Sequence, residues 1–443
     1  MKPYASYKPS GVPWLGAIPS DWRVEKLKFF AKFVGGGTPS KDEPMYWGGD
    51  IPWVSPKDMK QALIRDTEDS ITSEGLRSSP CTLIPPNSVL TVVRSGILQH
   101  TIPVAINTVP VTLNQDMRAL IPDRRVDSRY LAYQIEGCQK ELREEWVKQG
   151  ATVESIEHQR MIDSRLAVPS PDEQQSIADY LDAETTRIDT LIHEKDELIG
   201  LLREARTGRI SELISGGGLP GSSTGDPWAP RLPDGWTLKR LKHLAQVRSG
   251  LAKGKDTGGN PTVELPYLRV ANVQEGSLDL REISTMPVEL GAVERFSLVE
   301  GDVLMNEGGD YDKVGRGAVW TAEISPCLHQ NHVFAVRPIE RELSEWLAAI
   351  TQTQYAKFYF MNNAKQSTNL ASISQTTVKE LPILLPPKEQ RDALLKTLGA
   401  ELIAFDDLIA HTHDELTLLK ELRAATIADA VLGRIDVRTS PKS

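Results

Sequence analysis

The sequence contains two copies of one unit. Trp14 and Trp22 recur as Trp228 and Trp236, both at an offset of 214 residues. Nine of the 443 residues are tryptophan, so two such matches at one offset are hard to obtain by chance. A fixed period of this kind is the signature of internal duplication. The fold must therefore be one that a unit of about 215 residues can form twice.

Longer phrases extend the match along both copies. At or close to the same offset, IPWVSPKDM (51–59) aligns with LPYLRVANV (265–273), PSPDEQ (169–174) with LPPKEQ (385–390), and ISELISG (210–216) with IADAVLG (427–433). The duplication thus covers almost the whole chain, and each copy can be interpreted by comparison with the other.

Each copy begins with a stretch typical of a globular domain. Residues 14–165 and 228–382 mix turn residues with short strand-like runs, such as SVLTVV and HVFAV. One helical stretch follows late in each part, over 128–147 and 342–360. This mixture predicts an α+β (mixed α/β) domain in each copy.

The second part of each copy has the pattern of a long helix. Apolar residues recur at close to 3.5-residue spacing, which predicts helices over 172–215 and 388–433. Asp172 is the predicted N-cap of the first helix, whereas Lys388 offers the second no capping side chain. Such stripes need a partner, and the pattern predicts that they pack on each other like a coiled coil. The stripe residues are Leu181, Ile188, Leu191, Ile192, Leu198, Leu202, Ala205 and Leu213, then Leu398, Phe405, Leu408, Ile409, Leu416, Leu419, Leu422, Ile427 and Val431.

We therefore expect two globular heads held apart by a helical stalk, with an internal pseudo-twofold repeat. The expected boundaries are 1–168 for the first head, 169–216 for the first helix, 217–227 for a flexible Gly/Ser linker, 228–385 for the second head, 386–436 for the second helix and 437–443 for a tail.

Composition indicates a soluble cytoplasmic protein. No apolar run is long enough to span a bilayer, and the N-terminal segment lacks the apolar core of a secretory signal. Cys81, Cys138 and Cys327 are too scattered for a disulfide framework or a clustered zinc site. The net charge of −9 argues against a nucleic-acid binder, but most of it lies in 172–215 and 386–443. The heads are near neutral, which leaves room for a local basic groove.

Phosphate-binding signatures are weak. The run from Gly250 to Asp256 approaches a P-loop, but it is one residue short and has Asp in place of the hydroxyl residue. The triple glycine Gly35–Gly37 is more typical of a turn than of a phosphate site.

Metal-binding signatures are equally weak. Cys327, His329 and His332 have ligand chemistry, but the sequence match places Thr112, Asn114 and Met117 opposite them, and these form no ligand set. His411 and His413 lie two apart on a predicted helix, so their side chains point apart. A fused enzyme is thus a poor hypothesis, and we expect no catalytic residue, metal or cofactor in this chain.

The order of these parts resembles the specificity subunit of Type I restriction–modification enzymes. The phrases that carry the resemblance are GVPWLGAIPSDW (11–22), LPYLRVANVQEGSLDL (265–280), GDVLMNEGGDYDKVGRGAV (301–319), PPKEQ (386–390) and ELRAATIADAVLGRID (421–436). The resemblance implies a non-catalytic, sequence-specific DNA-binding subunit with two target-recognition domains. Each domain would read one half of a bipartite site in double-stranded DNA, and two antiparallel helices would set the gap.

The resemblance also implies partners. Two methyltransferase subunits would dock on this chain and bring S-adenosylmethionine, while restriction–translocase subunits would bring ATP and Mg²⁺. No membrane is implied.

Sequence reading needs polar side chains at base edges and cations at phosphates. The candidates lie in three polar loops that recur in both heads. Loop one carries Trp53, Ser55 and Lys57, matched by Tyr267, Arg269 and Asn272; loop two carries Arg94, Ser95 and Gln99, matched by Asn306, Lys313 and Arg316; loop three carries Lys148, Gln149 and Thr152, matched by Lys365, Gln366, Thr368 and Asn369.

A different class of function fits the same pattern. Two near-neutral heads on a helical scaffold could bind protein ligands instead of DNA. A salt series separates the two hypotheses, because affinity that comes from neutralising phosphates falls steeply with salt.

Overall fold

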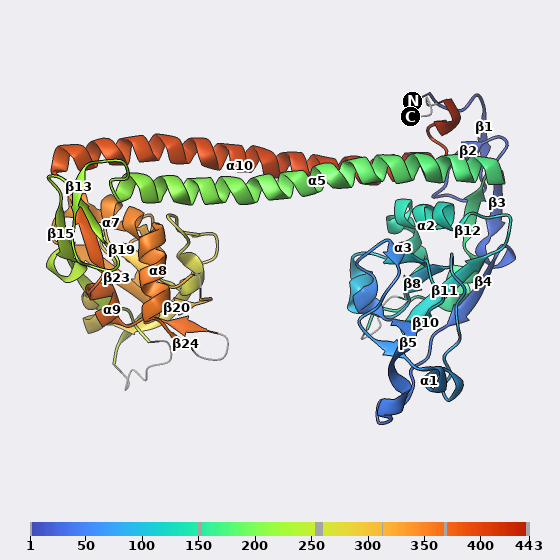
Figure 1. Ribbon diagram of the computed structural model, residues 1–443, viewed down its shortest axis with the longest axis horizontal. Coiled ribbons are helices and arrows are strands. Elements are labelled where there is room, and N and C mark those ends of the chain that lie inside the picture. The colour runs from blue at the N-terminus through green and yellow to red at the C-terminus, as the bar shows by residue number, and fades with distance from the viewer. Residues whose placement is uncertain (1, 149–152, 253–259, 312, 367–369, 440–443) are drawn as a thin grey trace. The chain divides into compact units, whose positions relative to one another are not determined.

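The computed structural model describes residues 2–148, 153–252, 260–311, 313–366 and 370–439. The chain divides into two compact units, one of residues 1–196 with 414–443 and the other of residues 197–413. Each unit contains one mixed α/β head and one half of each of two long helices (Figure 1). The units are described separately below.

The first head is built on a five-stranded sheet. Its order is β4 (Ala31–Gly35), β11 (Met117–Pro122), β8 (Val89–Val92), β9 (Val104–Asn107) and β6 (Leu63–Ile64). A second sheet has β5 (Trp47–Val54) between β10 (Thr112–Leu113) and β7 (Ser70–Ile71). β3 (Arg23–Lys26) pairs with β12 (Arg165–Val168). The helices are α1 (Ser73–Arg77), α2 (Ser128–Gly137), α3 (Gln139–Trp146) and α4 (His158–Asp163).

The second head repeats this frame. Its main sheet has the order β16 (Ala245–Ser249), β23 (Val333–Pro338), β19 (Val303–Asn306) and β21 (Gly317–Val319). β17 (Thr262–Leu268) lies between β18 (Ser284–Glu289) and β22 (Leu328–His329), and β15 (Thr237–Arg240) pairs with β26 (Pro382–Leu385). A small sheet joins β20 (Gly308–Gly309), β25 (Ala371–Ser372) and β24 (Lys365–Gln366). The helices are α6 (Val293–Phe296), α7 (Ser344–Thr351), α8 (Gln354–Asn363) and α9 (Gln375–Lys379).

The predicted duplication and mixed fold class are thus confirmed, with one difference in the helices. Each helical stretch expected as one piece is broken in two. The first breaks at Cys138, which has a non-helical backbone between α2 and α3. The second breaks at Thr353, whose hydroxyl accepts from the Ala356 N–H and so caps a new helix.

The long helices are α5 (Pro171–Ile214) and α10 (Lys388–Val431). The prediction that Asp172 caps the first helix is wrong, because α5 already begins at Pro171. The Ser170 carbonyl accepts the first bonds, from the N–H groups of Glu173 and Gln174, and Asp172 lies in the first turn. Two residues after each helix ends, a glycine has a positive φ: Gly216 (65°) after α5 and Gly433 (67°) after α10. This left-handed backbone conformation is typical of a helix C-terminal cap.

The two helices run antiparallel within each unit. In the first unit, Asp189 pairs with Arg423 at 2.7 Å, and the later Lys195 pairs with the earlier Glu415. In the second unit, Arg206 pairs with Asp406 at 2.9 Å, and Arg209 with Glu401 at 2.6 Å. The Asp189–Arg423 and Arg206–Asp406 pairs occupy corresponding positions of the two copies, so the duplication includes the contact between the helices.

The predicted apolar stripes are only partly covered. Leu181 and Ile188 are buried, but Leu408 and Leu422 are 49% and 48% exposed. A pair of helices covers one narrow strip of each partner, and an apolar face wider than that strip stays exposed. Among the described residues, no helix combines the length and apolar character that crossing a bilayer requires.

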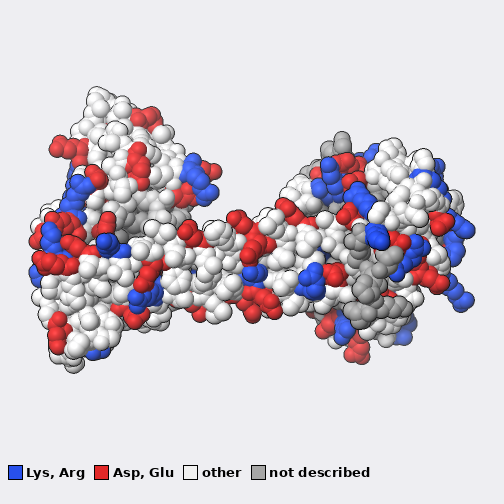
Figure 2. Space-filling model, turned by 90° about the horizontal axis from the view of Figure 1, so that it is seen from above, with Lys and Arg blue, Asp and Glu red and all other residues white. Residues whose placement is uncertain are grey.

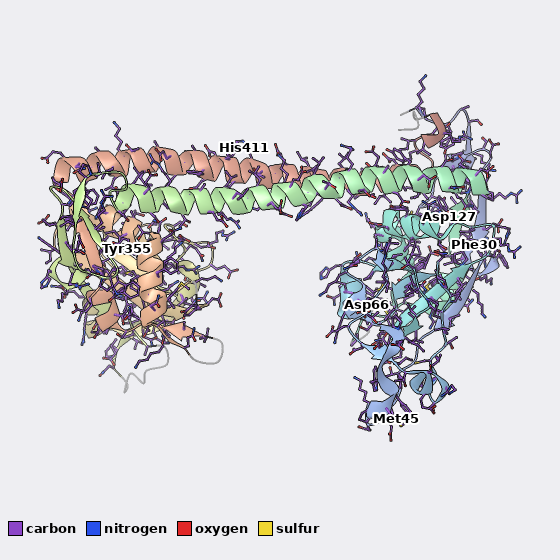
Figure 3. All side chains as sticks on the ribbon, in the orientation of Figure 1. Phe30, Met45, Asp66, Asp127, Tyr355 and His411 are labelled. Atoms are coloured by element: carbon purple, nitrogen blue, oxygen red, sulfur yellow. The ribbon has the colours of Figure 1, made fainter. Side chains whose placement is uncertain are left out.

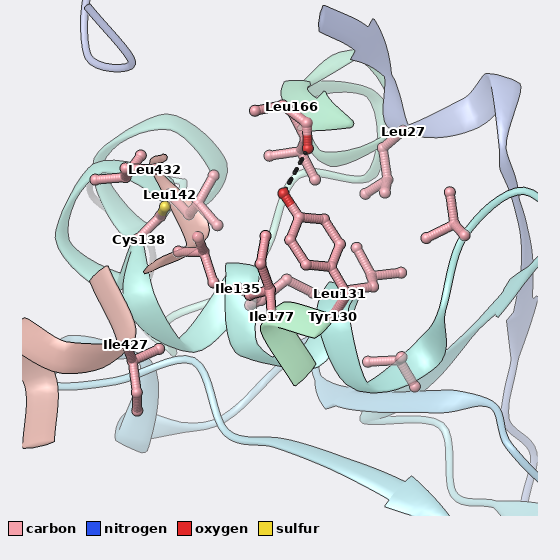
Figure 4. Packing of buried hydrophobic residues seen from close by; sticks show 14 of the residues in the cluster. Leu27, Tyr130, Leu131, Ile135, Cys138, Leu142, Leu166, Ile177, Ile427 and Leu432 are labelled. Carbon is pink, nitrogen blue, oxygen red and sulfur yellow. Dashed lines mark hydrogen bonds between the residues drawn. The ribbon is translucent and has the colours of Figure 1, made fainter. Parts of the chain in front are cut away.

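The ends of the long helices complete the cores of the heads. Ile427 and Val431 of α10 are buried in the same cluster as Tyr130 and Leu142 of the first head. Figure 4 shows Leu432 beside Cys138 and Leu142, and in the same cluster the Tyr130 hydroxyl donates to the Ala167 carbonyl at 3.0 Å. In the second unit, the end of α5 does the same through Ile210 and Ile214, which pack with Trp236 and Trp346. Each head is therefore closed by a helix of the other copy.

The segment expected as a flexible linker is partly a strand. β13 (Gly221–Ser223) pairs with β14 (Arg231–Pro233), as β1 (Tyr7–Pro9) pairs with β2 (Ala17–Pro19) at corresponding positions. In the first unit the segment after α10 meets the segment before β1, where the Asp436 N–H donates to the Lys2 carbonyl at 2.9 Å.

Candidate nucleic-acid interface

Loop one forms the same capped turn in both heads. Asp58 Oδ2 accepts from the Ser55 N–H at 2.8 Å, and Asn272 Oδ1 accepts from the Arg269 N–H at 2.9 Å. The Asn272 amide also donates to the carbonyls of Asp279 and Glu282. Ser55 and Asn272 are buried. The structure thus gives these two predicted DNA-reading residues a role in holding the loop.

The aromatic residues of loop one also face inward. Trp53 is 6% exposed, and its indole N–H donates to the Gly37 carbonyl at 2.9 Å. Tyr267, at the corresponding position, is 1% exposed and belongs to an apolar cluster. Both were expected at a DNA surface, but they sit on central strands whose inward side chains fill the core. Lys57 remains exposed and pairs with Glu68 at 3.5 Å.

Loops two and three come together in the first head. Arg94 and Ser155 form an antiparallel bridge, and the Ser95 N–H donates to the Glu154 carbonyl at 3.1 Å. Gln99 and Lys148 line one surface depression with Lys140, Arg143, Glu144 and Glu154. Gln149 and Thr152 lie outside the described residues.

The same two loops meet in the second head. Gly308 of loop two and Lys365 of loop three both pair with Ser372 on the central strand β25. Lys365 and Gln366 are exposed, while Thr368 and Asn369 lie outside the described residues. Loops two and three are about 50 residues apart in the sequence, and the β-ladder brings them together in the structure.

Asn306 links loop one to the start of loop two. It is 1% exposed, and its amide donates to the carbonyls of Val270 and Val273 at 3.3 and 3.1 Å. It was expected to contact bases directly; instead it holds the two loops together. Arg316, ten residues later, is half-buried, and Lys313 is exposed beside Asp310.

The exposed cationic side chains of loop two are paired with carboxylates that a DNA phosphate could replace. Arg94 Nε lies 2.6 Å from Asp116 Oδ1, with 56% of the Arg94 side chain exposed. Lys313 keeps the pKa of Asp310 below its ordinary value by donating to it. Exposed ion pairs of this kind contribute about 0–1 kcal/mol, so a phosphate can replace the carboxylate at small cost. Figure 2 shows basic and acidic side chains interspersed on both units, without a large patch of one sign on that face.

Gly36 and Gly250, which belong to the two glycine-rich segments of the sequence, lie where another backbone segment passes within contact distance. A Cβ at Gly36 would lie 1.8 Å from the Asn114 carbonyl oxygen, and one at Gly250 would lie 2.0 Å from that of His329. Glycine is required because two backbone segments touch. Gly36 and Gly250 correspond in the two copies, so the contact belongs to the shared frame. Residues 253–256 of the P-loop-like run lie outside the described residues.

Comparison with known proteins agrees with this duplicated architecture. The family model for the Type I restriction modification DNA specificity domain matches residues 19–199 and 233–418. The chain belongs to this family. Its two copies are therefore two DNA specificity domains.

Individual relatives support the assignment. The chain is 40% identical over 185 residues to the Type I restriction enzyme EcoR124I/EcoR124II specificity subunit of Escherichia coli, an alignment that covers 42% of this chain and 44% of that protein. It is 25% identical to the Type I restriction enzyme MjaIX specificity subunit of Methanocaldococcus jannaschii, over 96% of this chain and 95% of that one. A chain from a solved structure of the type I R-M system has the same fold, with a TM-score of 0.71 at 16% identity, over 94% of this chain and 99% of that chain.

Two histidines of the second specificity domain have structural partners. His329 is 1% exposed, and its Nδ1 lies 2.7 Å from the Val333 carbonyl oxygen, to which it donates. His332 is exposed and lies 2.9 Å from Glu307. His411, marked in Figure 3, is exposed on α10. Among the described residues, no group of three or more metal-ligating side chains is gathered.

We expect the buried His329 to make the second specificity domain acid-sensitive. Burial lowers its pKa from an ordinary 6.5 to about 4. Between pH 6.5 and pH 4 the folded state therefore binds fewer protons than the unfolded state. The contribution of His329 to the free energy of unfolding is complete above about pH 6.5 and is lost as the pH falls toward 4. The loss should be on the order of 3 kcal/mol.

The measurement is denaturant unfolding of the full chain between pH 7 and pH 4. His329→Leu copies Leu113, which occupies the same ladder position in the first copy, and should flatten the pH dependence of this domain. His332→Asn, which removes an exposed histidine of the same segment, is the matched control and should not flatten the pH dependence. A wild-type stability that is equal at pH 7 and pH 4.5 would contradict the prediction.

Proposed function

We propose that this chain is the DNA-reading subunit of a Type I restriction–modification complex and carries out no catalysis itself. Each specificity domain reads one half of a bipartite site in double-stranded DNA. The observation that carries this is the contrast between a shared frame and differing loops. The Gly36/Gly250 contact and the Asp58/Asn272 caps recur, whereas the exposed loop residues differ between the copies. One scaffold with two sets of exposed side chains fits two different half-sites.

The proposed DNA contacts are the predicted loop residues whose side chains remain at the surface. Arginine can bond guanine bidentately, glutamine can bond adenine, and lysine neutralises phosphate. In the first domain these are Lys57, Arg94, Ser95, Gln99 and Lys148, and in the second Arg269, Lys313, Arg316, Lys365 and Gln366.

The long helices supply the proposed docking surface for the methyltransferase subunits. Five large apolar side chains stay 48–64% exposed on α5 and α10, namely Leu201, Ile403, Leu408, Leu418 and Leu422. Leu418 and Leu422 are neighbours one helical turn apart on α10, and adjoining exposed apolar side chains mark interaction sites in soluble proteins. The methyltransferase partners would bring S-adenosylmethionine, and the restriction–translocase partners ATP and Mg²⁺, in the cytoplasm.

The test is selection of random double-stranded DNA by the full chain, followed by a salt series on the selected sequence. We expect a motif of two short specific parts separated by a fixed gap. With six to ten phosphates neutralised, affinity should fall roughly 10³- to 10⁵-fold between 50 and 200 mM salt. The double variant Lys148→Ala/Lys365→Ala should bind more weakly, whereas Lys242→Ala, which removes an ion-paired lysine outside the loops, should not.

Selection of no DNA motif, together with salt-insensitive capture of a protein, would favour the scaffold hypothesis instead. Methylation or cleavage of DNA by the isolated chain, supplied with S-adenosylmethionine, ATP and Mg²⁺, would disprove the non-catalytic part of the proposal.

A further inference from the structure

Arg118 occupies a position in the first domain that its sequence did not reveal. It lies on β11 directly between Gly35 of β4 and Thr91 of β8. A Cβ at Gly35 would lie 4.0 Å from an Arg118 terminal nitrogen, so the guanidinium lies beside the glycine at ordinary contact distance. The Thr91 hydroxyl is buried without a hydrogen-bond partner in the described part of the chain. This row therefore places a cation between a glycine and an unused hydroxyl.

The row lies beside loops two and three. Asp116, two residues before Arg118, accepts from the N–H groups of Val93 and Arg94, which begin loop two. His158 follows the end of loop three, and its Nδ1 lies 3.2 Å from an Arg118 nitrogen. The two loops and Arg118 thus share one end of the five-stranded sheet.

Arg118 has no counter-ion within the described residues. Arg94 pairs with Asp116 at 2.6 Å, whereas no carboxylate is paired with Arg118. An arginine is always charged, so His158 accepts from it as a neutral imidazole. Burial and the neighbouring Arg118 both lower the pKa of His158, burial contributing more. Among the described residues the side-chain partner of Arg118 is thus one neutral ring nitrogen, which leaves the charge of a half-buried guanidinium uncompensated.

The second domain shows that the fold does not need this cation. The ladder that contains Gly35, Arg118 and Thr91 corresponds to Ser249, Phe334 and Met305. Phe334 is buried in an apolar cluster, and the same frame forms around it. The arginine is therefore a feature of one domain and not of the scaffold.

We propose that Arg118 contacts the DNA bound by the first domain and determines one base of its half-site. The inference rests on the proposed function and names a residue within it. The partner chemistry is a pair of acceptors that a planar guanidinium can bond together. The guanine edge in the major groove supplies such a pair through N7 and O6. A phosphate supplies acceptors too, but it carries no sequence information.

The experiment compares DNA motifs selected by the full wild-type chain and by three variants. Arg118→Phe copies Phe334 and should keep the fold. Arg118→Lys keeps the charge and loses the bidentate fork. Lys32→Met is the matched control, since it removes an exposed cation from the neighbouring strand β4. Thermal melting of each variant checks that the domain is folded.

Both Arg118 variants should lose the preference at one position of one half-site, by roughly tenfold to a hundredfold. The other half-site and the Lys32→Met motif should stay unchanged. An unchanged motif in Arg118→Phe overturns the inference, and so does a loss that is equal for all sequences, which indicates a phosphate contact. If the wild-type chain selects no motif at all, the proposed function fails, and that outcome is distinct from either of these.

Discussion

Inserting four residues into both long helices, after Asp196 and after His413, should lengthen the gap of the DNA site and leave both half-sites unchanged. Four residues add about 6 Å and just over one helical turn, so the apolar stripes stay almost on their original faces. At about 3.4 Å per base pair, the gap should grow by one or two base pairs. Both insertions lie at the boundaries of the compact units, and every interhelical ion pair described above keeps its partner.

Affinity for the original site should fall roughly 10²- to 10³-fold, because only one half can then be read, and specific binding as a whole is worth about 10³- to 10⁷-fold. The measurement is binding to a series of DNAs that differ only in the gap. An insertion after Asp196 alone is the control: the unmatched residues should bulge out and leave the preferred gap unchanged. A matched insertion that keeps the original gap would show that the helices do not set it.

Truncating Ile427 should destabilise the first head, although this residue follows the second head in sequence. Ile427 is 1% exposed in the core of the first unit, and the corresponding Ile210 is fully buried in the core of the second. Ile→Ala at such a site costs about 2–5 kcal/mol. Hydrogen exchange should accelerate in α2 and β12 for Ile427→Ala, and in α7 and β26 for Ile210→Ala.

Leu418→Ala is the matched control on the same helix. Leu418 is 63% exposed, and its truncation should change stability by less than about 0.5 kcal/mol. If Ile210→Ala loosened the first head instead, the assignment of helix ends to heads would be wrong.

The architecture could be predicted because duplication and periodicity are properties of residue order. The tryptophan matches and the apolar stripes lead directly to two heads and two long helices. The helix ends could not be assigned to heads in this way. The apolar pattern that includes Ile427 is the same whether this residue packs on another helix or on a head. Its actual partner depends on where Tyr130 and its neighbours lie in three dimensions.

The candidate site was harder to predict, because polar residues in loops serve two purposes. Asn272 and Asn306 have side chains that suit adenine, but the structure uses both amides to bond loop carbonyls. Arg118 was missed because the copies drift by two residues before this strand. An alignment at one fixed offset conceals that Phe334 is its counterpart, whereas strand register reveals it.

The closing of the first head by the end of α10 has a consequence for synthesis of the chain. A ribosome that has completed Leu181 has made the buried core cluster of the first head except for the residues that come from the end of α10 and the segment after it, namely Ile427, Ala430, Val431, Leu432 and Val437. At about 5–20 residues per second, roughly 250 further residues take about 13 to 50 seconds. During that interval apolar surface on the first head lacks its cover. The second head meets no such delay, because Ile210 and Ile214 emerge before it and Leu398 just after. The first head to be translated is thus the last to be finished.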